Sequence, residues 1–307
     1  MTELRVLTTD DTAALSMEMA RAVEAGDMLA SSDPAGTFVL KAFGLHPSLF
    51  AGAFDGDHLV GFASAEFKIT VVRADRRRQG IGRALVDFAP RLARDRGYPE
   101  LLMGAVPGDP IAPAFLDATG FAYHSTVWDL DLPPDHEVPA PAWPDGVVGR
   151  PFDRERDVEA WVRVFNAAFA DHPTPLQLSL EFVQAGLADH DNEDGDVILA
   201  EETATGELVG TCATDPTRRE GRIGAHGEVW AVGVRPDRQG RGIGRQLVRA
   251  GVGRLRDVGV PAISLSVNGR NESALGLYES EGFVRARTRD RWARPVADAD
   301  TVAETRP

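Results

Sequence analysis

An internal repeat constrains this chain more than any other feature of its sequence. The segment Val72-Arg73-Ala74-Asp75-Arg76 matches Val234-Arg235-Pro236-Asp237-Arg238, and Gly80-Ile81-Gly82-Arg83 matches Gly242-Ile243-Gly244-Arg245, at one constant offset (242 − 80 = 162). Gly120-Phe121 and Gly282-Phe283 keep the same offset, so no insertion separates the matched segments. Self-similarity at a fixed offset indicates a duplicated structural unit, and the chain is therefore predicted to be two copies of one fold.

Prolines mark the boundary between the copies. Five of them lie between Leu132 and Gly146, too many missing amide donors for a helix or a central strand. The sequence thus predicts a first domain over residues 1–132, a linker over 133–146 and a second domain over 147–295. Residues 296–307 contain no aromatic side chain and are predicted to form a flexible tail.

The second copy shows the order of elements most clearly. Helical spacing of apolar residues covers 157–170 and 242–258, and strands are predicted over 196–201, 207–214, 228–234 and 262–267. A short helix over 271–281 and a last strand over 283–294 follow. This order predicts an α+β fold with a mixed, mostly antiparallel central sheet flanked by helices.

Composition excludes several classes of protein. With 47 acidic and 33 basic residues the formal charge is −14, which disfavours nucleic acid and anionic membranes as partners and favours a cationic one. The single cysteine, Cys212, excludes an internal disulfide and the multi-cysteine zinc sites, and no metal is expected. The sequence has no apolar run of membrane-spanning length and no signal peptide, so a cytoplasmic location is expected.

The repeated glycine-rich loop carries the strongest chemical signal. Residues 232–245 run from a strand into a helix N-terminus, where unpaired amides and the helix dipole favour a phosphate. A P-loop would need Gly-Lys-Ser/Thr, and a dinucleotide fold would need a glycine directly after the strand; neither occurs here. Gly233, inside an apolar strand, predicts a bulge that separates two parallel strands.

This loop, together with Asn271, Leu277-Tyr278-Glu279 and Gly282-Phe283, resembles the GNAT superfamily of N-acetyltransferases. The resemblance implies two tandem GNAT domains and acetyl-CoA as the co-substrate. In the second copy it implies cofactor contacts by Val232, Gly233, Val234, Gln239, Gly240, Arg241, Gly242, Ile243, Gly244, Arg245, Asn271, Ser273 and Ala274. In the first copy it implies them for Val71, Val72, Arg77, Arg78, Gln79, Gly80, Ile81, Gly82 and Arg83.

Transfer to an amine requires a base and an acid, because an alkylammonium is almost fully protonated at pH 7 and the departing thiolate needs a proton. The strand at Glu228 and the segment Phe169-Ala170-Asp171-His172-Pro173 resemble the mycothiol synthase family, also a tandem protein, which implies Glu228 as the general base. Tyr278 matches the general acid of the GNAT superfamily. The alternatives are an ion-paired strand carboxylate for Glu228 and a packing aromatic for Tyr278.

Neighbouring residues allow further interpretations. His226 shares a strand face with Glu228 and is either a proton relay or a loop histidine. Asn271 is a helix cap, a cofactor contact, or both. Cys212 is interpreted as a small buried hydrophobe. Ser266 stands where the mycothiol synthase family has a tyrosine.

The two copies differ where the chemistry is expected. The first copy keeps the loop and has Glu66 at the position of Glu228, but Leu116 replaces Tyr278 and Asp109 replaces Asn271. Residues 61–66 also run into 69–72 without an evident turn. The first domain is therefore predicted to be non-catalytic.

The leading hypothesis for the whole protein is direct acetyl transfer from acetyl-CoA to a primary amine. The acceptor is a small molecule, such as an amino sugar or aminoglycoside-like compound, or a peptide, and the protein is a monomer or a homodimer. Mycothiol synthase proper and a non-catalytic acyl-CoA-sensing regulatory protein are the alternatives.

Overall fold

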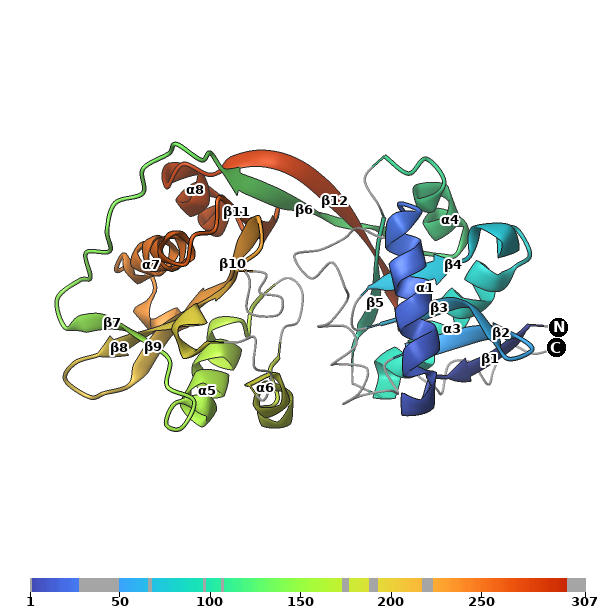
Figure 1. Cartoon of the computed structure of the whole chain (residues 1–307), viewed down its shortest axis with the longest axis horizontal. Helices are drawn as coiled ribbons and strands as arrows, with labels where there is room; N and C mark the ends of the chain where they lie inside the picture. The colour runs from blue at the N-terminus through green and yellow to red at the C-terminus, as the bar shows by residue number, and fades with distance from the viewer. Residues whose placement is uncertain are drawn as a thin grey trace. The chain divides into compact units, whose positions relative to one another are not determined.

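The computed structural model describes residues 2–27, 50–65, 68–95, 98–105, 108–172, 177–187, 193–216 and 223–296. The chain divides into two compact units. Unit 1 comprises residues 1–126 and 289–307, and unit 2 comprises residues 127–288. Figure 1 labels the helices and strands of both units.

Unit 1 is built on a sheet in which β1, β2, β3 and β4 are antiparallel neighbours in that order. Its core contains apolar residues of these strands and of the helices α1 and α3, such as Leu15, Phe62 and Leu85. The elements are β1 (Glu3–Val6), η1 (Thr9–Asp11), α1 (Thr12–Glu24), β2 (Phe50–Asp55), β3 (His58–Ser64), β4 (Ile69–Val72), η3 (Ala74–Arg76), α3 (Ile81–Asp95), β5 (Glu100–Gly104) and α4 (Ala112–Ala118).

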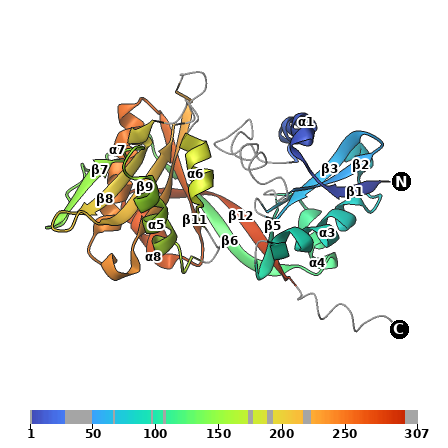
Figure 2. The ribbon, with the colours of Figure 1, turned by 90° about the horizontal axis from the view of Figure 1, so that it is seen from below.

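Unit 2 is built on a sheet with the strand order β6-β11-β10-β9-β8-β7, in which only the β10–β11 pair is parallel. Helices α7 and α8 cover one face and α5 and α6 the other (Figures 1 and 2). The elements are β6 (Ala122–Leu132), β7 (Val147–Pro151), α5 (Val158–Ala168), α6 (Leu180–Leu187), η4 (Asp194–Asp196), β8 (Val197–Glu202), β9 (Leu208–Asp215), β10 (His226–Val234), η5 (Pro236–Arg238), α7 (Ile243–Asp257), β11 (Ala262–Asn268), α8 (Glu272–Ser280) and β12 (Val284–Pro295).

The last strand of each sequence copy pairs with a strand in the other copy's unit. Residues 127–132 of β6 pair antiparallel with β11 in unit 2, where Leu130 and Leu132 are buried in the core. Residues 291–295 of β12 pair antiparallel with β5 in unit 1. There Arg294 donates to the carbonyl oxygens of Val86 and Thr119. Each unit therefore takes one paired strand from the other repeat, while the domain boundaries inferred from the repeat remain a prediction.

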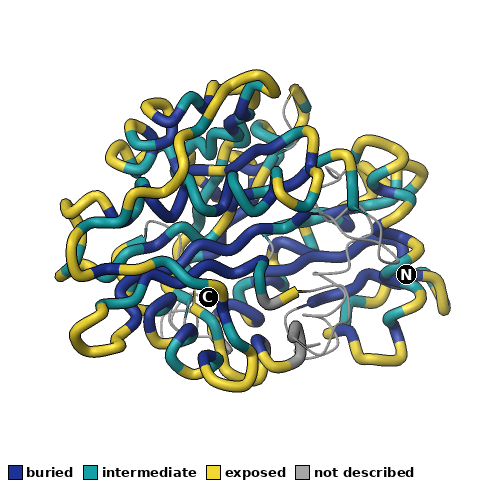
Figure 3. The backbone as a smooth tube through the Cα atoms, turned by 60° about the vertical axis from the view of Figure 1, so that its left-hand side comes forward, coloured by how far each residue is buried: buried dark blue, intermediate teal, exposed yellow. Residues whose placement is uncertain are grey.

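The predicted fold class is confirmed. In unit 2 each predicted helix and strand is present within two residues of its expected ends. Figure 3 colours the backbone by burial. Most residues of β8, β9 and β11 are buried. The expectation that 61–66 continues into 69–72 is wrong, because β3 ends at Ser64 and β4 begins at Ile69 as its antiparallel partner. In the described part of the chain, no helix is long and apolar enough to cross a membrane.

The proline-rich segment 133–146 packs along unit 2. Val138 and Trp143 contact its core, and the amide of Ala142 donates to Oε1 of Gln246 on α7 at 2.8 Å. Arg256, near the end of α7, donates to the carbonyl oxygen of His136. These contacts hold the segment against unit 2, although it contains no helix or strand. Of the predicted tail, residues 297–307 lie outside the described residues.

Candidate active site

Two parallel strands separate in the middle of unit 2. β10 and β11 are paired only from His226–Ala262 to Glu228–Ser264, although both strands continue beyond that point. A register shift lies between Trp230 and Gly233, with Ala231 at a positive φ of 53°, which confirms the predicted bulge. The backbone of Val232 to Val234 thus turns away from β11. An extended amide chain of the pantetheine type fits between two strands that diverge in this way.

Gly233 is required at this bulge by packing. A Cβ on Gly233 would lie 2.8 Å from Cβ of Ala168 and from Cε2 of Phe169, both at the end of α5. Neither atom can move aside unless the helix moves, because the ring centroid of Phe169 lies only 4.6 Å from that of Phe165. The close approach fixes where β10 leaves its partner.

Polar side chains gather on the face of this sheet that points away from α7. Val229, Leu265 and Leu130 lie in the core on the α7 side, so their neighbours in each strand face the opposite way. These neighbours are His226, Glu228, Ser264, Ser266, Asp129 and Asp131. On β9, Asp215 lies directly opposite Glu228. The face beside the strand separation therefore carries four carboxylates.

Hydrogen bonds connect these groups across the strands. Nε2 of His226 lies 2.8 Å from Oγ of Ser264. Oγ of Ser266 lies 2.8 Å from Oδ1 of Asp129 and 3.4 Å from Oε1 of Glu228. His226 and Glu228 share a face as predicted, but the hydrogen bond of the His226 ring is to Ser264 on β11 and not to Glu228. Asp129 and Asp131 were missed because they lie in the first repeat, although their alternation with Leu130 and Leu132 marks a strand with one polar face.

The glycine-rich loop after β10 has the conformation that an anion site needs. Gly240 and Gly242 have φ values of 74° and 82°, and no atom lies within 4 Å of a Cβ built on either. Gly242 caps α7 without a side-chain hydrogen bond, so the amides of Ile243, Gly244 and Arg245 start the helix without an internal partner. These residues and their conformation fit the pyrophosphate of acetyl-CoA.

The basic side chains of this loop already have acidic partners. Arg245 pairs with Glu281, and Arg241 lies 3.8 Å from Glu202 while its side chain is 43% exposed. Gln239 donates from Nε2 to the carbonyl oxygen of Val234 at 3.1 Å. The backbone amides and Arg241 are therefore the groups of this loop most accessible to an anion.

The first copy repeats this backbone conformation. Arg78 and Gly80 have φ values of 64° and 83°, close to those of the equivalent Gly240 and Gly242. Arg77, at the position of Gln239, donates to the carbonyl oxygen of Val72 as Gln239 does to Val234. Non-glycine residues rarely adopt positive φ, so Arg78 holds the turn at a cost in free energy.

Other predicted residues of the first copy take structural contacts. Gln79 donates to the carbonyl oxygen of Asp75, and Arg83 to that of Ala118. Ile81 and Val71 are buried, and Cβ of a residue at Gly82 would make ordinary contacts with Phe115 and Val72. Leu116 is buried in the core and has no proton to donate. Glu66 lies outside the described residues.

Helix α8 holds the other predicted groups. Asn271 accepts from the amide of Ala274 and from the hydroxyl of Ser273, both at 3.1 Å, and so caps the helix. Tyr278 is 7% exposed and its ring meets Phe283 edge-on. Burial raises the pKa of Tyr278, which keeps its hydroxyl protonated over the physiological range.

Cys212 lies on the opposite side of the sheet from Glu228. It is fully buried, and this burial raises the pKa of its thiol to about 12. The thiolate form that a nucleophile needs is therefore not available at pH 7.

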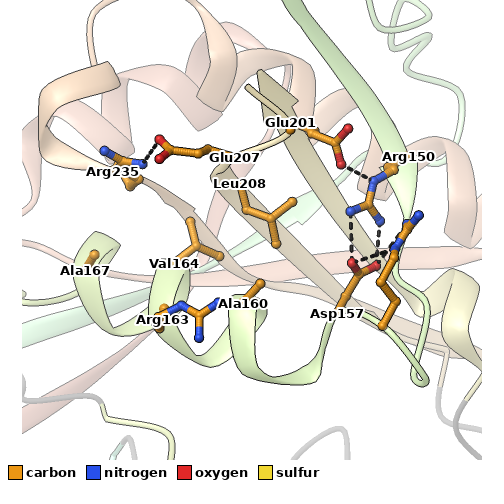
Figure 4. Close-up of a pocket in the computed structure, with 12 residues that line it drawn as sticks. Arg150, Asp157, Ala160, Arg163, Val164, Ala167, Glu201, Glu207, Leu208 and Arg235 are labelled. Carbon is orange, nitrogen blue, oxygen red and sulfur yellow. Dashed lines mark hydrogen bonds and ion pairs between the residues drawn. The ribbon is translucent and has the colours of Figure 1, made fainter. Parts of the chain in front are cut away.

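A separate pocket of about 760 Å³ lies between α5 and the β8–β9 hairpin (Figure 4). Arg150 donates from Nε to Glu201 at 2.6 Å and forms a bidentate pair with Asp157, and Arg235 donates to Glu207 at 3.1 Å. None of the site residues predicted from the sequence lines this pocket. Its walls are held by internal ion pairs, so it is not the centre of the expected chemistry.

Comparisons with known proteins match both repeats. The model of the acetyltransferase (GNAT) family matches residues 21–121 and 159–283. Mycothiol acetyltransferase of Thermomonospora curvata is 39% identical over 220 residues, which cover 70% of this chain and 69% of the relative. The protein of the same name from Kytococcus sedentarius is 35% identical over 254 residues, covering 80% of this chain and 81% of the relative.

Solved structures show the same fold. A GCN5-related N-acetyltransferase from Sphaerobacter thermophilus aligns with a TM-score of 0.65 at 21% identity, covering 97% of this chain and 96% of its own. A tandem GNAT protein from the clavulanic acid biosynthesis pathway aligns with a TM-score of 0.65 at 18% identity, covering 98% of this chain and 100% of its own.

Proposed function

Because the chain belongs to the GNAT acetyltransferase family and is an acyl-CoA-dependent N-acetyltransferase, we propose that unit 2 acetylates a primary amine of a cationic small molecule by direct transfer. The observation that carries this proposal is the position of Glu228. Its carboxylate lies at the last paired residue before β10 and β11 separate, and the anion-binding loop begins at the end of the same strand.

Glu228 supplies the base. An ammonium of pKa about 10.4 is neutral in roughly one molecule in 10³ at pH 7, so removing its proton first costs about 4–5 kcal/mol. A carboxylate beside the amine takes that proton as the nitrogen attacks. Asp129 and Asp215 on the same face add negative charge, which favours a cationic acceptor over a neutral or anionic one.

The amides of Ile243, Gly244 and Arg245 would hold the pyrophosphate of acetyl-CoA, and Val232 to Val234 would pair with its pantetheine. The bound co-substrate supplies an acetyl group activated as a thioester. Tyr278 keeps its hydroxyl proton at neutral pH and can donate it to the sulfur that leaves as the new amide bond forms.

Acetylation of the amine precursor of mycothiol is the second candidate. The relatives named mycothiol acetyltransferase favour it, with 39% and 35% identity over most of this chain. Ser266, in place of an expected tyrosine on β11, favours a different acceptor for this protein. A non-catalytic acyl-CoA sensor is less well supported, because Glu228 and Tyr278 are both present.

The test is a panel of amines assayed by release of free thiol from acetyl-CoA. The panel contains amino sugars, aminoglycosides, peptides and the mycothiol precursor, each paired with its N-acetylated form as the control. We expect amine-dependent thiol release with at least one cationic acceptor, and an N-acetyl product by mass. Binding of acetyl-CoA without thiol release on any amine would contradict catalysis and support the sensor.

A further inference from the structure

We propose that Ser266 and Asp129 form a proton path from Glu228, so that the base is a chain of three side chains on three adjacent strands. The inference rests on the proposed function, since it needs Glu228 to receive a proton. Its basis is the Ser266 hydroxyl, which lies 2.8 Å from Oδ1 of Asp129 and 3.4 Å from Oε1 of Glu228.

The strand register explains why these groups meet. β11 lies between β10 and β6, and Ser266 is directly opposite Asp129. Glu228 is directly opposite Ser264, one residue of the same face before Ser266. The three side chains therefore project from the same side of the sheet where the β10–β11 pairing ends.

The two distances give the path a direction. A hydroxyl has one proton, and the shorter contact directs it to Asp129, which leaves the lone pairs of Oγ toward Glu228. While Glu228 is ionised, both carboxylates of the path are acceptors, and the single Ser266 proton can be donated to Asp129 or to Glu228. Once Glu228 has taken the proton of the ammonium, it donates to Oγ of Ser266, and the hydroxyl donates to Asp129.

The step balances without any further reactant. The Glu228 proton moves to Oγ of Ser266 while the Ser266 proton moves to Oδ1 of Asp129, so the hydroxyl is restored and one proton reaches Asp129. The proton thus passes between two groups of the same chemical kind, both carboxylates. Asp129 is half-exposed and returns the proton to water, which restores Glu228 for the next turnover.

Unit 1 is a built-in comparison for this path. The residues at the same repeat positions are Gly104 for Ser266 and Arg291 for Asp129, and they are paired in the same register on β5 and β12. Glycine has no hydroxyl, and a guanidinium cannot accept a proton. Unit 1, which has Leu116 in place of Tyr278, thus also lacks both members of the path.

The strand exchange gives this path an unusual origin. Asp129 lies on β6, which is the last strand of the first sequence copy, while Ser266 and Glu228 belong to the second. We therefore infer that the first copy serves the reaction by supplying a positioning residue to unit 2.

The experiment compares Ser266→Ala, Ser266→Thr and Asp129→Asn with the wild type, using the full chain and the best amine of the panel. We expect Ser266→Ala and Asp129→Asn each to lower kcat about 10-fold, with the KM for acetyl-CoA unchanged. Ser266→Thr keeps the hydroxyl and should restore most of the rate. The double variant should lose no more than either single one, because one broken link interrupts the path.

The matched control is Asp131→Asn. It removes a carboxylate from the same face of β6, but Asp131 lies opposite Ser264, whereas Asp129 lies opposite Ser266. We expect its kcat to stay within about twofold of the wild type. The solvent deuterium isotope effect on kcat should reflect two protons in flight in the wild type and one in Ser266→Ala. Thermal unfolding of every variant establishes that it is folded.

The outcomes separate this inference from the proposed function. Wild-type kcat and isotope effect in Ser266→Ala, with a strong loss in Glu228→Gln, would overturn the path and leave the base in place. Wild-type activity in Glu228→Gln would overturn both. Equal losses in Asp131→Asn and Asp129→Asn would show that the face acts through its total charge, which also overturns the path.

Discussion

Nε of Arg249 donates to a carboxylate oxygen of Glu281 at 2.7 Å, and Glu281 is only 4% exposed. Burial alone would raise the pKa of this carboxyl, but the hydrogen bonds from Arg249 and Arg245 hold it below its ordinary value. The pair ties the end of α8 to the side of α7. The helix that carries Tyr278 is thereby fixed against the helix that begins at the anion-binding loop.

Replacing Tyr278 by phenylalanine tests the proposed acid. We expect kcat to fall about 10²–10⁴-fold with little change in acetyl-CoA affinity, because the hydroxyl acts on charge that appears only as the thiolate leaves. Pre-steady-state kinetics with calorimetric binding measure both quantities. A variant whose chemical step keeps the wild-type rate would assign Tyr278 to packing against Phe283.

The Glu228→Gln variant tests the base through pH. Without the carboxylate the ammonium must lose its proton to water, so the pH–rate profile should move to higher pH and the rate at pH 7 should fall. Measuring kcat/KM from pH 6 to pH 10 checks this, with Asp131→Asn as the variant of equal charge change. An unchanged profile would make Glu228 structural and direct attention to His226.

The two glycine-rich loops provide a matched pair of substitutions. Gly244 and Gly82 lie in the first turn of the helix that follows each loop. A Cβ at either position has only ordinary contacts, 3.6 Å and 3.4 Å from its nearest neighbours, so a leucine adds bulk beside the amides that would hold the pyrophosphate. We expect Gly244→Leu to abolish turnover and one CoA-binding event. Gly82→Leu should abolish a second binding event and leave turnover in place.

Calorimetric titration beside the turnover assay measures both effects. A single binding event in the wild type that disappears in Gly244→Leu would show that the first loop binds no CoA. A folded but inactive Gly82→Leu protein would contradict the assignment of catalysis to unit 2 alone.

Asp157 predicts a dependence of stability on pH. Burial by itself would raise its pKa, but the hydrogen bonds from Arg150, Arg156 and the amide of Asp153 lower it to about 2. A carboxyl whose folded pKa is lowered stabilises the protein above its unfolded pKa, and the contribution is lost as the pH falls towards the folded value. This contribution is about 2 kcal/mol at pH 7 and decreases between about pH 4 and pH 2.

Asp157→Asn should therefore lower the free energy of unfolding by at least about 2 kcal/mol at pH 7, and by much less at pH 2.5. Urea titrations at the two pH values measure this difference. Glu159→Gln is the control, because the Glu159 side chain is 74% exposed and its pair with Arg163 at 3.6 Å is expected to contribute less than about 0.5 kcal/mol. Equal effects of Asp157→Asn at both pH values would contradict the argument.

The sequence predicted the local features of the site well. The positive φ at Gly240 and Gly242 follows from glycines between a strand and a helix, and the bulge follows from Gly233 in an apolar strand. Both depend on residues close together in the chain. The repeat then placed the equivalent loop in the first copy, where even Arg78 adopts the expected backbone conformation.

The strand exchange could not be predicted in the same way. The alternation around Leu130 suits an outer strand of either unit, because the two sheets are copies of each other. The choice depends on pairing across the whole chain, and nothing local in residues 127–132 specifies it. Asp129 belongs to the first sequence copy, and only the pairing of β6 with β11 brings it opposite Ser266.

The exchanged strands also determine how early unit 1 can complete its strand pairing during synthesis. A ribosome that has completed β5 must still add nearly two hundred residues before the partner of β5, residues 291–295, leaves the exit tunnel. At about 5–20 residues per second this interval is roughly 10–40 s. Throughout it, β5 has an unpaired edge of the kind that chaperones cover and that aggregates extend. A nascent chain arrested before residue 289 should consequently need chaperone protection for its first unit, even though every residue numbered below 126 has already been made.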